Sequence, residues 1–138
     1  MPKINCIILD DEPLAVELLK KHASENDNLT ISLATTEVFE AIDFLKNNKV
    51  DLIFTDIQMP ELTGIQLMKI LDHSQKFIVT TAYPNYALES FNFHVVDYLL
   101  KPITKERFDA SVKKYFDFFQ TTLTKSQSTY LFVKADGK

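Results

Sequence analysis

The chain has 138 residues, of which 46% are hydrophobic and 25% charged, with a formal net charge of −4 and a pI near 5.3. This length predicts one domain with a single sizeable core, and no apolar run approaches the roughly 20 residues that span a bilayer. The negative charge argues against nucleic-acid binding by this stretch alone, because such binding depends on Lys and Arg against phosphates. With two glycines, the chain has neither a P-loop nor a dinucleotide-binding loop.

The N-terminus lacks the pattern of a signal peptide, so a cytoplasmic location with no membrane contact is the expectation. Cys6 is the only cysteine and lies in an apolar run, which indicates a buried, reduced thiol.

Two strand–helix units are predicted in the first fifty residues. An apolar strand at 4–9 is followed by three acids and by Pro13, which suits the first turn of a helix. Residues 29–34 alternate apolar with polar, as in an edge strand, and Thr35 or Thr36 is expected to cap the next helix. The expected apolar faces are Leu14, Ala15, Leu18, Leu19 and His22 on the first helix, and Val38, Phe39, Ile42 and Leu45 on the second.

The central strand, 51–56, is an apolar run that ends on Asp56, and its lack of alternation is typical of a strand covered on both faces. A third helix follows, then a strand at 77–81, a short helix at 85–91 and a strand at 95–100. Thr104 is expected to cap the last helix. The apolar faces are Ile65, Leu67, Met68, Ile70 and Leu71 on the third helix, and Phe108, Val112, Tyr115, Phe116 and Phe119 on the last.

Five strand–helix repeats predict an α/β, doubly wound (flavodoxin-like) domain at 1–121. We expect a five-stranded parallel sheet in the order 2-1-3-4-5 with five flanking helices. Residues 122–129 have the composition of a linker, and 130–138 become strand-like again, as the first-strand remnant of a second domain.

Polar residues stand at four of the predicted strand ends: Asp10 and Asp11, Asp56, Thr81, and Lys101. Carboxyl ends of parallel strands share one edge, which is where α/β sheets bind ligands. Clustered carboxylates suit Mg²⁺, Asp56 is a candidate nucleophile, and Lys101 and Thr81 could bind phosphate oxygens. Taken singly, each residue could instead be a helix cap or a solvated group, but no structural need requires acids, hydroxyl and amine to converge.

Four segments resemble the signatures of bacterial two-component response-regulator receiver domains. They are residues 8–13 (ILDDEP), 56–64 (DIQMPELTG), 80–83 (TTAY) and 96–102 (VDYLLKP), and the resemblance extends from residue 4 to about 119. The strand order given above is also that of this family.

The resemblance implies a role for each matching residue. Asp56 would accept a phosphoryl group from the phosphohistidine of a sensor histidine kinase. Asp10, Asp11 and the backbone carbonyl of Gln58 would hold Mg²⁺ together with Asp56. Lys101, with a cis bond to Pro102, would pair with the phosphoryl group, Thr81 would move toward it, and Tyr98 would turn inward as the switch.

The segments 80–87, 95–98 and 130–138 resemble the LytTR type, whose receivers precede a DNA-binding domain; DNA contact would need that missing domain. A homodimer through the fourth helix, fifth strand and fifth helix is possible, with Tyr86, Phe91 and Phe118 contributing. The resemblance implies a phospho-switch with at most slow self-dephosphorylation, shielded by Tyr83 and Gln58. The alternatives are a pseudo-receiver, which would show an incomplete acidic set, and a phosphohydrolase, which would need an acid–base group where Gln58 stands.

Overall fold

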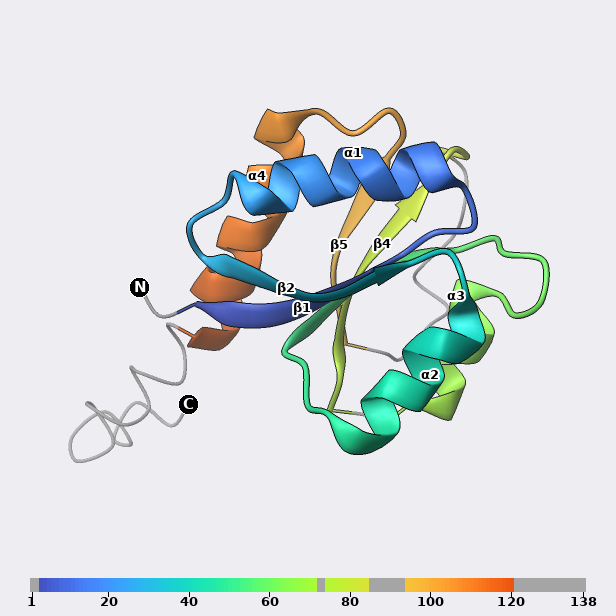
Figure 1. Ribbon diagram of the computed structural model, residues 1–138. Coiled ribbons are helices and arrows are strands. Elements are labelled where there is room, and N and C mark those ends of the chain that lie inside the picture. The colour runs from blue at the N-terminus through green and yellow to red at the C-terminus, as the bar shows by residue number, and fades with distance from the viewer. Residues whose placement is uncertain (1–2, 72–73, 85–93, 121–138) are drawn as a thin grey trace, which may run out of the picture.

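The computed structural model describes residues 3–71, 74–84 and 94–120. Five parallel strands form one sheet in the order β2-β1-β3-β4-β5 (Figure 1). This is the predicted doubly wound fold, and every strand boundary lies within one residue of its predicted position. The strands are β1 Ile4–Leu9, β2 Leu29–Thr35, β3 Leu52–Asp56, β4 Lys76–Thr81 and β5 His94–Leu100.

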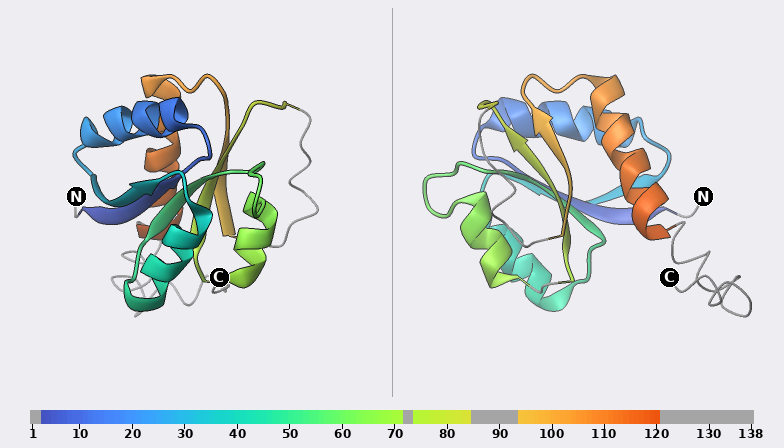
Figure 2. Two further views of the ribbon diagram at one scale, coloured as in Figure 1. Left: turned by 45° about the vertical axis from the view of Figure 1, so that its right-hand side comes forward. Right: turned by 180° about the vertical axis from the view of Figure 1, so that it is seen from behind.

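Helices cover both faces of the sheet, with α1 and α4 on one side and α2 and α3 on the other (Figures 1 and 2). The helix predicted at 85–91 lies outside the described residues, as do the proposed linker and the segment 130–138. Within the described ranges, no helix is both long and apolar enough to cross a bilayer. The helices are α1 Pro13–Ser24, α2 Val38–Asn47, α3 Gly64–Ile70 and α4 Lys105–Tyr115, continued by a π-helical turn, Phe116–Gln120.

The core has two parts, one on each face of the sheet, and β3 contributes to both. Phe54 packs on the α1/α4 side, where its ring stacks on Phe108 with centroids 4.9 Å apart. Ile53 packs on the α2/α3 side. All five residues of β3 are buried, as the unbroken apolar run predicts. Because this strand is buried and closely packed, it holds Asp56 in a fixed position at the carboxyl edge of the sheet.

The predicted face of α1 is partly wrong. Leu14 and Leu18 are 83% and 37% exposed, whereas Val16 and Ala23 are buried beside Leu19. The helix carries two overlapping apolar stripes, and only one can face the sheet. His22, which is also buried, bonds to the loop before α4 and helps to fix this rotation.

Other local predictions have mixed outcomes. Glu37, not a threonine, is the cap residue of α2, although the Thr35 hydroxyl accepts the Glu37 N–H at 2.9 Å. Phe39 and Ile70 are 57% and 56% exposed, so they do not belong to the buried faces of α2 and α3. Thr104 caps α4 as predicted, accepting from the N–H of Arg107.

Candidate functional site

Three carboxylates meet at the carboxyl edge of the sheet. Asp56 is the last residue of β3, while Asp10 and Asp11 directly follow β1, its neighbour in the sheet. One carboxylate oxygen from each lies within 4.8 Å of the others. Asp10 is fully buried and Asp56 is 7% exposed, whereas Asp11 is half-buried. The predicted acidic cluster is therefore assembled, with its third member facing solvent.

Lys101 joins this cluster from β5, on the far side of β4. Its Nζ lies 2.8 Å from Oδ2 of Asp10 and 3.3 Å from Oδ2 of Asp56. Its backbone N–H donates to the carbonyl of Thr81 at 2.7 Å, which ties the ends of β4 and β5 together. The Lys101–Pro102 peptide bond is cis, as the resemblance implied. One ammonium group thus bridges the two most buried carboxylates.

In the described part of the chain, the negative charges of the site are not balanced by positive ones. Three carboxylates against one ammonium leave two formal negative charges. Burial, and then the neighbouring Asp10, raise the pKa of Asp56 despite the opposing effect of Lys101. Burial alone would lower the pKa of Lys101, but its contacts with Asp10 and Asp56 raise it overall. The site would be stabilised by a further positive charge.

The donor set fits a hard divalent cation. Mg²⁺ prefers a few carboxylate oxygens and keeps several waters, and the half-buried Asp11 opens one side of the cluster to solvent. Asp10, Asp11 and Asp56 would hold the ion, which would offset their repulsion and the charge of an incoming phosphate.

Two further polar residues were predicted for this edge, Gln58 in the loop after β3 and Thr81 at the end of β4. The N–H of Gln58 donates to Oδ1 of Asp56 at 3.3 Å. Thr81 is fully buried, and its hydroxyl oxygen accepts the N–H of Tyr83 at 3.0 Å. Because a hydroxyl that accepts can also donate, Thr81 keeps a hydrogen for another oxygen.

At Gly64 the chain passes very close to the backbone of Asp56. A Cβ at this position would lie 2.5 Å from the carbonyl oxygen of Asp56 and 3.0 Å from the Cα of Ile57. The N–H of Gly64 also donates to the carbonyl of Ile57 at 3.0 Å. A glycine is needed here because the backbone passes too close for any side chain.

Tyr98 lies on β5, three residues before Lys101, and is half-buried. Its hydroxyl donates to the backbone carbonyl of Tyr83 at 3.2 Å, so it contacts the loop that follows Thr81. Tyr98 therefore contacts the loop whose movement it would have to sense if it acted as a switch.

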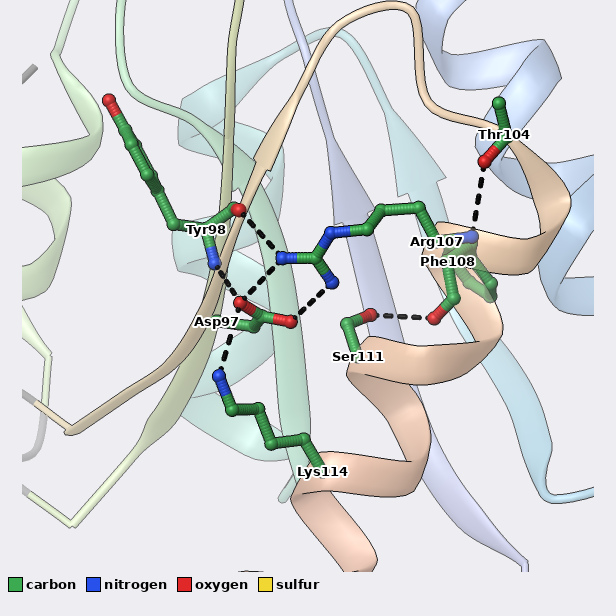
Figure 3. Close-up of polar contacts among 7 residues, drawn as sticks. All are labelled: Asp97, Tyr98, Thr104, Arg107, Phe108, Ser111 and Lys114. Carbon is green, nitrogen blue, oxygen red and sulfur yellow. Dashed lines mark hydrogen bonds and ion pairs between the residues drawn. The ribbon is translucent and has the colours of Figure 1, made fainter. Parts of the chain in front are cut away.

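A second charged cluster, which sequence reasoning missed, surrounds Asp97 (Figure 3). Arg107 of α4 binds its carboxylate with both terminal nitrogens, at 2.7 and 2.9 Å, and also reaches the carbonyl of Tyr98. Lys114 lies 3.5 Å away, and the N–H of Tyr98 donates at 2.8 Å. Burial alone would raise the pKa of Asp97, but these partners lower it overall. The only signal in the sequence was a carboxylate inside an apolar strand.

Comparison with known proteins agrees with this geometry. Residues 6–113 match the family described as the response regulator receiver domain. The chain therefore belongs to that family, whose members are regulatory phosphoacceptors of two-component signalling.

Among individual proteins, the chain is 34% identical over 113 residues to the transcriptional regulatory protein BtsR of Escherichia coli K12, covering 80% of this chain and 47% of BtsR. An uncharacterized response regulatory protein of Shewanella oneidensis is 35% identical, with 80% and 48% covered. The chain thus spans about half the length of these relatives. The response regulatory domain of mrkE from Klebsiella pneumoniae superposes with a TM-score of 0.75 at 29% identity, covering 86% of this chain and 99% of that domain.

Proposed function

We propose that Asp56 is the phosphoacceptor of this receiver domain. The observation that carries the proposal is the position of its carboxylate, which is buried beside two other acids and in contact with the single ammonium of Lys101. Asp56 is also the acid whose carbonyl and side chain are fixed by the following loop, through the close approach of Gly64 and the bond from Gln58.

The transfer would begin with attack by a carboxylate oxygen of Asp56 on the phosphorus of a phosphohistidine in a sensor histidine kinase. The P–O bond forms as the P–N bond breaks, and the imidazole leaves with the electron pair. Lys101 would bind one phosphoryl oxygen, and the free hydrogen of Thr81 would be donated to another. Mg²⁺, held by Asp10, Asp11, Asp56 and the Gln58 carbonyl, would supply charge neutralisation.

Phosphorylation would then favour a second arrangement of the β4–β5 side of the domain. A phosphoryl group adds about −1.5 to −2 charges at pH 7, and only a shifted Thr81 can satisfy the new oxygens. The loop at Tyr83 would move with Thr81, which breaks the bond from the Tyr98 hydroxyl and allows this ring to turn inward. The signal is a shift between two existing states.

The output of the whole protein is proposed from its relatives. BtsR is named as a transcriptional regulatory protein and is longer than this chain. We therefore propose a cytoplasmic LytTR-type regulator that binds DNA through a C-terminal domain outside residues 1–121. We also propose a homodimer through β5, α4 and the helix predicted at 85–91, and the 60% exposure of Phe118 supports such a surface. Tyr86 and Phe91 lie outside the described residues.

The test is incubation with acetyl phosphate and MgCl₂, followed by intact mass spectrometry. One base-labile adduct of a single phosphoryl group is expected on the chain, with none on Asp56→Asn and none in EDTA. An adduct that persists on Asp56→Asn would contradict the assignment. Loss of the adduct should be slow and should accelerate in Tyr83→Ala if Tyr83 limits the access of water.

A further inference from the structure

His22 is a buried polar residue for which the phosphoacceptor mechanism has no role. It lies on α1, is 7% exposed, and its Nε2 is 2.8 Å from the carbonyl oxygen of Ile103. A carbonyl can only accept, so Nε2 must carry the hydrogen. The two residues are 81 positions apart in the sequence, and Ile103 is the second residue after Lys101. The bond therefore connects α1 to the segment that bears the site lysine.

The same imidazole ring also reaches the aromatic contacts behind Asp56. Its centroid is 5.5 Å from that of Phe108, which in turn stacks on Phe54 at 4.9 Å. Phe54 is two residues before Asp56 on β3. Nδ1 of His22 is buried with no hydrogen-bond partner in the described part of the chain, so the Nε2 bond is the polar contact that orients the ring.

We infer that His22 is a positioning residue for Lys101, and this inference rests on the proposed phosphoacceptor function. The segment from Lys101 to Thr104 exposes Pro102 and Thr104 and has one buried member, Ile103. It is fixed at its start by the bond from Lys101 to Thr81 and at its end by the cap of α4. His22 fixes its middle, and the Ile103 carbonyl is buried against α1 because His22 satisfies it.

Loss of this bond would change the site in a defined direction. An unsatisfied buried carbonyl turns toward water, and the segment moves with it. Of the two ion pairs of Lys101, the one with Asp10 is shorter, at 2.8 Å, than the one with Asp56, at 3.3 Å. The contact with Asp56 is therefore the one that would lengthen, and the phosphoryl group would lose the cation that receives it.

Substitution by Gln and by Met separates this role from core packing. Gln places an N–H at nearly the same distance along the side chain as His Nε2, whereas Met fills a similar volume without a donor. Leu19→Ala is the matched control, because Leu19 lies on the same face of α1, is 1% exposed, and contacts the core without bonding to the loop.

The experiment measures the rate constant of phosphorylation of the 138-residue chain by acetyl phosphate in MgCl₂, with urea unfolding of each variant. We expect His22→Met to be at least tenfold slower than wild type, His22→Gln to be within threefold of it, and Leu19→Ala to be near wild type despite lower stability. A wild-type rate in His22→Met, or equal slowing in Leu19→Ala, overturns the positioning role while leaving Asp56 as acceptor. A wild-type chain that takes up no phosphoryl group overturns both.

A second measurement needs no variant. Long-range ¹H–¹⁵N NMR of the wild-type imidazole should show His22 as the Nε2–H tautomer, with a proton that is protected from exchange. The Nδ1–H tautomer would overturn the inference, because the Ile103 carbonyl would then have no donor.

Discussion

Asp56 and Asp97 are two strand carboxylates with nearly equal burial and opposite electrostatics. They are 7% and 8% exposed, yet the pKa of Asp56 is raised and that of Asp97 is lowered. Burial favours the neutral acid at both positions. The difference must therefore come from their partners.

The charged partners of the two carboxylates differ. The Asp97 carboxylate is bound by both terminal nitrogens of Arg107 and by the backbone N–H of Tyr98, and Lys114 lies further away. None of these groups is shared with another acid in the part of the chain that the structure describes. Asp56 shares Lys101 with Asp10 and lies beside a third acid. Among the described residues, the charge of Asp97 is thus offset by two cations, whereas the three acids around Asp56 share one ammonium, a perturbed arrangement that agrees with the role proposed for Asp56.

The largest expected effect is that of Gly64→Ala, which tests whether the close contact between the backbones of Gly64 and Asp56 is needed for stability. The added Cβ would meet the Asp56 carbonyl oxygen at 2.5 Å, so the start of α3 and the end of β3 must separate. We expect a loss of about 3 kcal/mol in the free energy of unfolding by urea and slower phosphorylation. Unchanged stability would show that the loop can adapt, and Ile65→Ala at the next position serves as the control.

Asp97→Ala should lower the free energy of unfolding by about 2 kcal/mol, because it removes several charge-assisted hydrogen bonds. The loss is limited because the half-exposed Arg107 can still be hydrated. Phosphorylation should remain measurable, since none of the lost contacts includes Asp56 or Lys101. Urea unfolding and intact mass after acetyl phosphate give the two readouts. A stable variant that cannot be phosphorylated would contradict a structural role for Asp97.

The sequence was sufficient to predict that the acids and Lys101 lie together, but not to predict the Asp97 cluster, for a physical reason. Asp10, Asp56 and Lys101 directly follow or end apolar strands, and parallel strands place such residues at one edge whatever the helices do. The contact of Arg107 with Asp97 depends instead on the position of α4 across β5. In the same way, the rotation of α1 decides that Val16 is buried while Leu14 is exposed, and periodicity alone allowed both.

Asp56→Asn should stabilise the protein, whereas the two substitutions above destabilise it. The pKa of the native Asp56 is raised, so its contribution to stability is present below the unfolded pKa and is lost as the pH rises through the native value. Removing this charge should therefore stabilise the protein at pH 7 in EDTA by about 1 kcal/mol. Added MgCl₂ should stabilise wild type more than the variant. A destabilised variant in EDTA would mean that the pair with Lys101 outweighs the combined effect of burial and of repulsion by Asp10.

Arg107→Lys is the smallest and most selective change, because it keeps the charge near Asp97 but loses the planar, two-nitrogen contact. Since the Arg107 side chain is 45% exposed and water screens the pair, we expect a loss of only about 0.5–1 kcal/mol at pH 7. The lowered pKa of Asp97 means that its stabilisation is present above the unfolded pKa, about 3.9, and is lost as the pH falls through the native pKa. In Arg107→Lys this loss should begin at a higher pH, which urea unfolding between pH 5 and 3 and an NMR titration of the Asp97 carboxyl would detect. Equal titration of Asp97 in both proteins would assign the lowered pKa to its backbone N–H and Lys114 instead of the guanidinium.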